Sequence, residues 1–187
     1  MEPIEAFDRA GTAATAVVNG IGDDQWDLPT PCAEWTVRGV LNHLVIVGMI
    51  GEAIVAGRAH PDQRVDHLGR DPKATFATTL AANRATVRTP GLMGRVVSTP
   101  MGERPGSVLV DTLVAELVVH TWDLARATGQ DTDLDPELAQ EVRTSWTTRL
   151  GDRPRTLLPY EEPQPVPDGA TAADRLAAYL GRTVVVA

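Results

Sequence analysis

The sequence predicts an all-α protein built as a helix bundle. Hydrophobic residues make up 43% of the 187 positions but aromatic residues only 4%, so the core must be built from Ala, Val and Leu. A β-sandwich usually draws more heavily on Tyr, Phe and Trp. Apolar residues recur at helical spacing between recognisable caps and stops, which supports the same fold class.

The bundle is expected to consist of long helices bounded by clear start and stop signals. Thr36 is a suitable N-cap, Asp71 followed by Pro72 marks another helix start, and Gly129 is a typical left-handed stop. The expected helices cover 4–19, 36–57, 72–88 and 107–128. A long connection is expected to carry the chain back across the bundle before the last of these helices begins.

The connections are predicted from proline, glycine and charge. Prolines exclude a continuous helix from 22–34, and 58–70 is a polar loop. Residues 93–105 contain a short extended piece and a turn, which indicates a small hairpin or an ordered crossover. A fifth helix is expected at 135–150, a wrapping segment at 151–168, and a short helix near 171–180 that a Thr171–Asp174 capping box opens.

We expect one domain over 1–187, with its core at about 1–130 and a C-terminal wrap at 131–187.

Charge and cysteine content exclude several classes of partner. The formal net charge is −8 and Lys73 is the sole lysine, so no basic stripe is available for a nucleic acid. Cys32 is the sole cysteine, which fits a reducing cytoplasm. The acidic N-terminus does not read as a secretory signal, and the longest apolar run, 44–50, is too short to cross a bilayer. A cytoplasmic protein without nucleic-acid or membrane partners is expected.

Two histidines and a glutamate occupy positions where a helix would ordinarily carry leucine. His43 lies inside the apolar pattern of 36–57, and Glu116 and His120 lie four residues apart inside 107–128. Residues i and i+4 share one side of a helix, so Glu116 and His120 can reach one ion that His43 approaches from another helix. An unpartnered ionisable group is costly to bury. Two imidazoles and a carboxylate form an open ligand set for a divalent metal.

A metal-free interpretation of these residues stays open at this point. A core histidine often does no more than share a hydrogen bond with a carbonyl or carboxylate, so His43 and Glu116 can form a simple buried pair. A Glu–His pair at i and i+4 also occurs on helix surfaces. His60 and His67 belong to a polar loop and are expected to face solvent.

Other conspicuous residues receive structural interpretations. Trp26 and Trp35 flank the proline loop and are expected to pin it to the bundle. No residue spacing in the sequence indicates a general base next to Cys32. This cysteine is therefore interpreted as a small buried hydrophobic residue rather than a nucleophile. Trp122 is expected to pack the linker, and Asp123 is assigned no chemistry.

Two sequence blocks resemble a known family. Residues 25–38, QWDLPTPCAEWTVR, lead to Asn42-His43-Leu44 and resemble the start of the mycothiol-dependent maleylpyruvate isomerase metal-binding domain, within the DinB-like superfamily. Residues 117–129, LVVHTWDLARATG, resemble a second block of an actinobacterial subgroup. The resemblance extends from Phe7 to about Arg182.

The resemblance implies an up-down-down-up four-helix bundle whose metal triad matches His43, Glu116 and His120. Zinc is the usual metal, and nickel, iron or manganese also fit this ligand set. Gly39 departs from the acidic residue of many relatives. The isomerases also carry a further C-terminal domain that helps bind substrate, whereas only a short stretch follows Gly129 here. Maleylpyruvate isomerisation itself is therefore not the expected reaction.

The function expected from residues and resemblance together is a metal-dependent thiol S-transferase-like enzyme. It would use a low-molecular-weight thiol, implied to be mycothiol, on a small electrophile. Three alternatives stay open: a metal-dependent hydrolase that activates water, a non-catalytic metal-binding module of a stress response, and a bundle without metal. A homodimer is a further expectation.

Overall fold

The computed structural model describes residues 1–32, 35–100, 102–151 and 161–185 and confirms the all-α class. Its α-helices lie where the caps and stops predicted them, to within a few residues at each end. They are α1 (Pro3–Gly20), α2 (Val37–Ala56), α3 (Pro72–Thr86), α4 (Gly106–Thr128), α5 (Pro136–Leu150) and α6 (Ala172–Tyr179).

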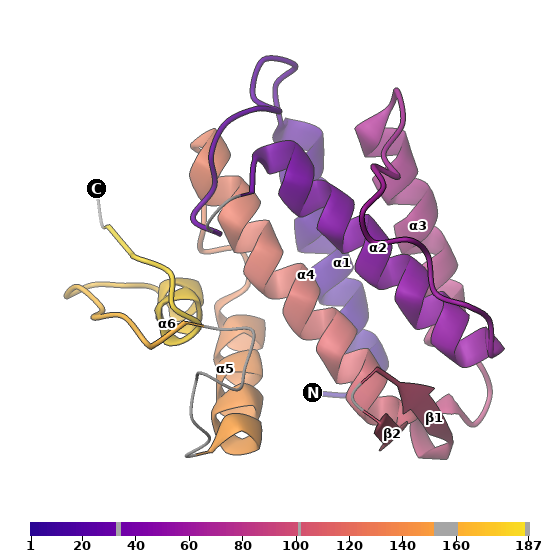
Figure 1. Ribbon diagram of the computed structural model, residues 1–187. Helices are drawn as coiled ribbons and strands as arrows, with labels where there is room; N and C mark the ends of the chain where they lie inside the picture. Colours follow the sequence, from indigo (N-terminus) through magenta and orange to yellow (C-terminus); the bar gives the residue numbers. More distant parts are fainter. Residues whose placement is uncertain (33–34, 101, 152–160, 186–187) are drawn as a thin grey trace.

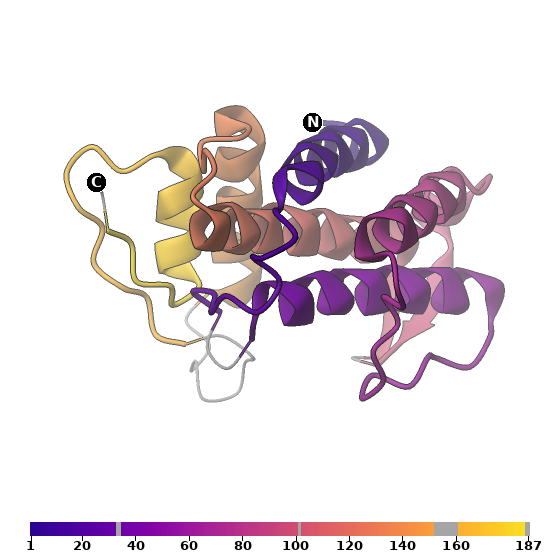
Figure 2. The same ribbon diagram turned by 90° about the horizontal axis from the view of Figure 1, so that it is seen from above.

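The first four of these helices form the bundle. α4 packs against both α1 and α2, and α3 packs against α2 and, less extensively, against α1. Figures 1 and 2 show α4 running through the middle of the molecule, with α2 and α3 on one side of it. The core between the helices is mostly aliphatic. Its largest fully buried side chains include Phe7, Leu41 and Leu124.

Local signals fix the ends of the two central helices. The Thr36 hydroxyl accepts a hydrogen bond from the Gly39 N–H at 3.2 Å, so Thr36 caps α2 as predicted. Gly57 and Gly129 adopt φ of 63° and 70° directly after α2 and α4. That left-handed conformation suits glycine, which has no Cβ to clash.

The connection between α3 and α4 is a hairpin rather than a simple crossover. A 3₁₀ turn, η1 (Leu92–Gly94), precedes β1 (Val96–Thr99), which pairs antiparallel with β2 (Gly102–Pro105). The Gly106 N–H donates to the Arg95 carbonyl at 2.8 Å, so α4 begins directly at the base of the hairpin. The predicted turn at 101–103 includes Met101, which lies outside the described residues.

α5 and α6 pack together on the side of α4 that faces away from α2 and α3 (Figures 1 and 2). The capping box of α6 is present, with Thr171 and Asp174 bonding each other's backbone N–H groups. The buried Trp122 ring donates to the Asp174 carboxylate at 2.9 Å and packs against residues of α5 and α6, and it lines a cavity together with Thr132 and Leu134 of the α4–α5 linker. Part of the predicted wrapping segment, 152–160, lies outside the described residues.

α2 is the one helix among the described residues that is long and apolar enough to cross a membrane, with a mean hydropathy of 1.8. The expectation of too short an apolar run rested on 44–50 alone, and the whole helix passes the test of length and composition. Half of that window is buried inside the bundle. A core helix of a soluble protein passes the same test, so α2 is weak evidence for a membrane span.

Candidate metal centre

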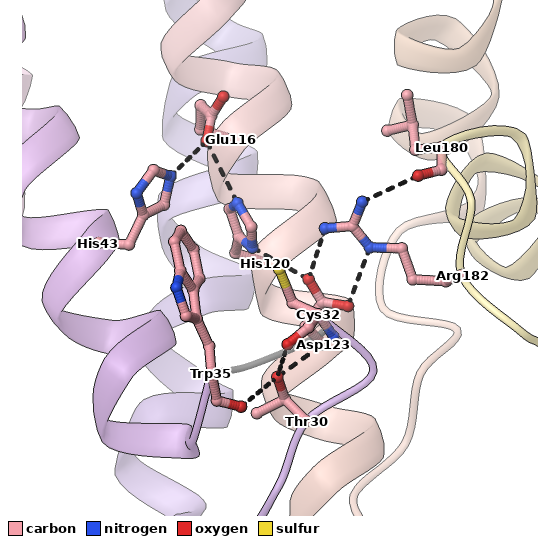
Figure 3. Close-up of polar contacts among 9 residues, drawn as sticks. All are labelled: Thr30, Cys32, Trp35, His43, Glu116, His120, Asp123, Leu180 and Arg182. Carbon is pink, nitrogen blue, oxygen red and sulfur yellow. Dashed lines mark hydrogen bonds and ion pairs between the residues drawn. The ribbon is translucent and has the colours of Figure 1, made fainter. Parts of the chain in front are cut away.

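His43, Glu116 and His120 meet between α2 and α4 (Figure 3). The Glu116 Oε2 atom lies 2.9 Å from His43 Nε2 and 3.3 Å from His120 Nε2. One possible ligand atom of each residue lies within 4.8 Å of those of the other two. The structure therefore brings together the three side chains that the sequence singled out, from the two helices on which it placed them.

The spacing of these donor atoms suits a small cation. Two ligands bound at 2.0–2.2 Å in a tetrahedral site lie about 3.4 Å apart. The separations of Glu116 Oε2 from His43 Nε2 and His120 Nε2, 2.9 and 3.3 Å, are hydrogen-bond lengths somewhat shorter than that value, so the cluster needs to widen only slightly to hold a cation. Two imidazole nitrogens and one carboxylate oxygen also leave positions open for a further ligand, as catalytic zinc sites do.

The electrostatics of the cluster hold Glu116 as a carboxylate. Burial opposes its ionisation, but the hydrogen bonds to His120 and His43 outweigh that cost and keep the pKa of Glu116 well below its usual range. Burial likewise disfavours the charged form of His120, yet hydrogen bonds with Asp123 and Glu116 raise the pKa of His120 to about 9. Because the carboxylates of Glu116 and Asp123 stabilise positive charge at His120, they also favour the binding of a cation at this site.

Asp123 lies directly behind His120 and was assigned no chemistry from the sequence. Its Oδ2 atom is 3.0 Å from His120 Nδ1, and its side chain has no exposed surface. Arg182 donates to the same carboxylate, from Nη2 at 3.0 Å and from Nε at 3.3 Å (Figure 3). Burial opposes ionisation of Asp123, but His120 and Arg182 hold its pKa below the usual range.

Of Asp123 and Arg182, only Asp123 could have been linked to His120 from the sequence. Asp123 follows His120 by three residues, a spacing that places both on one side of a helix. Arg182 is 59 positions further along the chain, and no local pattern links it to His120. Only the folding of the C-terminal segment against α4 brings it there.

The indole of Trp35 forms a wall of the site. Its ring centroid lies 4.6 Å from that of His43 and 5.9 Å from that of His120, and 37% of the residue is exposed. The Thr30 hydroxyl contacts the Trp35 carbonyl at 2.9 Å, which ties the proline loop together at this point. Trp35 thus covers the histidine rings in addition to its expected role in the loop.

Cys32 lies close to the site but is poorly suited to act as a nucleophile. It is half-buried, and burial together with the nearby Asp123 carboxylate raises the pKa of its thiol to about 11. Cys32, His120 and Asp123 form a second group of side chains close enough to share an ion. His120 belongs to both groups, although its Nδ1 already bonds Asp123.

The other two histidines lie outside the cluster. His60 is exposed, as expected. His67 is only partly exposed, because its Nε2 contacts the Asp62 carbonyl at 2.7 Å and its backbone N–H donates to the Asn42 side chain.

The fold and the site define a helix-bundle protein with a histidine- and carboxylate-lined site between two of its helices. The chain belongs to the mycothiol maleylpyruvate isomerase N-terminal domain family, whose sequence pattern matches residues 7–125. Two uncharacterised proteins of Mycobacterium tuberculosis, from the strains CDC 1551 / Oshkosh and ATCC 25618 / H37Rv, are each 36% identical to it. Each match covers 98% of this chain and 100% of the relative.

Solved structures of the mycothiol-dependent maleylpyruvate isomerase share this fold. One gives a TM-score of 0.59 at 13% sequence identity, and a histidine-to-alanine mutant gives 0.57 at 14%. Each match covers 79% of this chain and 71% of the isomerase chain. At such low identity, the likeness shows the common fold.

Proposed function

We propose that this chain is a metal-dependent enzyme that transfers a low-molecular-weight thiol, such as mycothiol, to a small electrophile. The observation that carries the proposal is the meeting of His43, Glu116 and His120 around a space suited to one cation. Membership of a mycothiol-related enzyme family supports the choice of thiol.

The proposed ligands are His43 Nε2, Glu116 Oε2 and His120 Nε2. A bound divalent cation, zinc being the expected one, supplies the charge that keeps a thiol sulfur deprotonated near neutral pH. In such a transfer the S–H proton passes to solvent and the sulfur forms a bond to an electrophilic carbon. In a substitution the electron pair of the broken bond departs with the leaving group. In an addition the π pair of a carbon–carbon double bond moves to the neighbouring carbon, which takes up a proton from solvent.

The surrounding residues bind and orient rather than react. Asp123 holds the His120 ring by its Nδ1 atom, so that Nε2 faces Glu116. Trp35 lies over both histidine rings and provides an apolar wall that limits access of water. Because its thiol pKa is raised to about 11, Cys32 stays protonated, and the reactive sulfur is assigned to the small thiol instead.

The test measures bound metal and thiol-conjugating activity in untagged protein. Wild type is compared with His120→Ala, with His60→Ala as the matched control because His60 is exposed and outside the cluster. We expect about one zinc per chain and thiol-dependent turnover of model electrophiles in wild type and control, and loss of both in His120→Ala. Full metal retention by His120→Ala would refute the ligand assignment, and turnover without added thiol would indicate a hydrolase.

A further inference from the structure

Arg182 reaches the candidate metal centre from a part of the chain far from the ligands. It follows α6 in the C-terminal segment, beyond the residues 7–125 that match the family pattern. Its guanidinium nevertheless contacts both carboxylate oxygens of Asp123, from Nη2 to Oδ2 at 3.0 Å and from Nε to Oδ1 at 3.3 Å (Figure 3). A third donor, Nη1, bonds the Leu180 carbonyl at 3.1 Å.

The contact between Arg182 and Asp123 is buried on both sides. The Asp123 side chain has no exposed surface and that of Arg182 has 10%. A carboxylate buried so deeply is costly unless a partner offsets its charge and its remaining lone pairs are bonded. Within the described residues, Arg182 supplies that positive charge, and the His120 ring supplies the other donor.

A chain of contacts runs from Arg182 through Asp123 to His120, which is a proposed metal ligand. Asp123 Oδ2 is shared between Arg182 Nη2 and His120 Nδ1, each at 3.0 Å. The guanidinium is a planar fork that fixes a carboxylate by two bonds at once. With its carboxylate held in this way, Asp123 can fix the plane of the His120 ring and direct Nε2 toward Glu116.

We propose that Arg182 is a positioning residue of the metal centre, which acts on His120 through Asp123. The inference rests on the proposed metal site. The C-terminal segment that contains α5 and α6 then belongs to the metal site, because it carries Arg182, which orients the proposed ligand His120. Outer partners of metal-binding histidines typically change metal affinity by roughly 10- to 100-fold when they are removed.

The test measures zinc affinity of the untagged full chain by competition with a chromophoric chelator. The variants are Arg182→Gln, Asp123→Asn and the double variant, and Arg175→Gln is the control because it removes an exposed arginine of α6. We expect Arg182→Gln to bind zinc roughly 10- to 100-fold more weakly and Arg175→Gln to match wild type. If Arg182 acts through Asp123, the double variant binds within about twofold of Asp123→Asn alone.

A second readout separates positioning from general stability. The Nδ1–H proton of His120 should give a slowly exchanging, downfield NMR signal in wild type and Arg175→Gln, and the signal should broaden or vanish in Arg182→Gln. If Arg182→Gln does not fold, Arg182→Lys replaces it, with an expected loss of zinc affinity of about threefold or more because a single ammonium cannot match the fork.

Several results would overturn the inference while leaving the proposed function intact. They are wild-type zinc affinity in folded Arg182→Gln, wild-type affinity in Arg182→Lys where that variant is needed, or fully additive losses in the double variant. Failure of the wild-type chain to bind zinc, nickel, iron or manganese would instead reject the proposed function.

Discussion

The Nδ1 atom of His120 lies 3.0 Å from the Oδ2 atom of Asp123, three residues further along α4. Because a carboxylate can only accept, the ring must carry a proton on Nδ1 and donate it to Asp123. Nε2 is then the nitrogen that faces Glu116, at 3.3 Å. A carboxylate behind a ligating histidine fixes the tautomer and raises the basicity of the ring.

Replacing Asp123 by Asn should therefore weaken zinc binding without removing a ligand. We expect roughly a 10- to 100-fold loss of affinity, because the amide cannot offset the charge of Arg182 and orients His120 less firmly. The number of ions bound at saturating zinc should stay the same as in wild type. Titration followed by elemental analysis measures both quantities, and an unchanged affinity would show that Asp123 has a purely structural role.

The fold was largely predictable because its helices carry local signals. Thr36, Asp71 and Asp135 each accept a backbone N–H at the start of a helix, and their caps are visible in the sequence. The hairpin was only half predictable, since Val96–Thr99 and Gly102–Pro105 are short and mostly exposed and therefore show little hydrophobic alternation. Pairing between two such strands depends on their contacts with α2 and α4, which no local pattern in the sequence shows.

The candidate site was predictable where it depends on helical spacing and unpredictable where it depends on long-range packing. Glu116 and His120 are one turn apart on α4, and the burial cost of His43 indicated a partner, so these residues could be proposed together. The position of Arg182 requires the chain to pass through α5 and α6 and return to α4. The covering position of Trp35 depends likewise on how the proline loop folds over α2.

Two groups of side chains near the site could share an ion, and single substitutions distinguish them. His43, Glu116 and His120 form one group, and Cys32, His120 and Asp123 form the other. If the first group is the metal centre, His43→Ala should lose bound zinc while Cys32→Ala keeps about one ion per chain. Elemental analysis of both untagged variants decides the matter.

Far-UV circular dichroism of Cys32→Ala and His43→Ala provides the control, because both should keep the helical spectrum of wild type. The opposite pattern, with metal lost from Cys32→Ala and retained by His43→Ala, would transfer the site to the cysteine-containing group. Loss from both variants would indicate that the ion contacts residues of both groups.

Gly106, the first residue of α4, should not tolerate a side chain. A Cβ atom there would lie 2.1 Å from the Leu92 carbonyl oxygen, and a backbone atom at that distance cannot move aside cheaply. Alanine favours a helix by up to about 1 kcal/mol over glycine, but the clash should dominate. We expect Gly106→Ala to destabilise the fold by about 1–3 kcal/mol.

The matched control for this substitution is Gly94→Ala in the preceding 3₁₀ turn. A Cβ on Gly94 meets nothing within 4 Å, so its free energy of unfolding should stay within about 0.5 kcal/mol of wild type. Urea unfolding of the two variants side by side measures the difference. Equal stability of Gly106→Ala and wild type would mean that Leu92 and the hairpin can shift away from α4.

Asp135 should support the fold in a pH-dependent way. Its carboxylate accepts the Leu138 N–H at 3.1 Å, which caps α5, and two nitrogens of Arg9 in α1 donate to it at 2.6 and 2.8 Å. Burial opposes ionisation, but Arg9 and the Leu138 N–H hold the pKa of Asp135 below its usual range. Asp135→Ala should cost about 1 kcal/mol for the cap and up to about 1 kcal/mol for the partly exposed ion pair.

A carboxyl group with a lowered pKa in the folded state stabilises that state at any pH above its unfolded pKa, about 3.9. The stabilisation is lost as the pH falls from there through the folded pKa. The stability difference between wild type and Asp135→Ala should therefore be constant above about pH 5 and shrink below about pH 4. Asp71→Ala, which removes the cap of α3 but no ion pair with Arg9, is the control for the cap alone. A difference that widens on acidification would contradict the proposed Arg9–Asp135 pair.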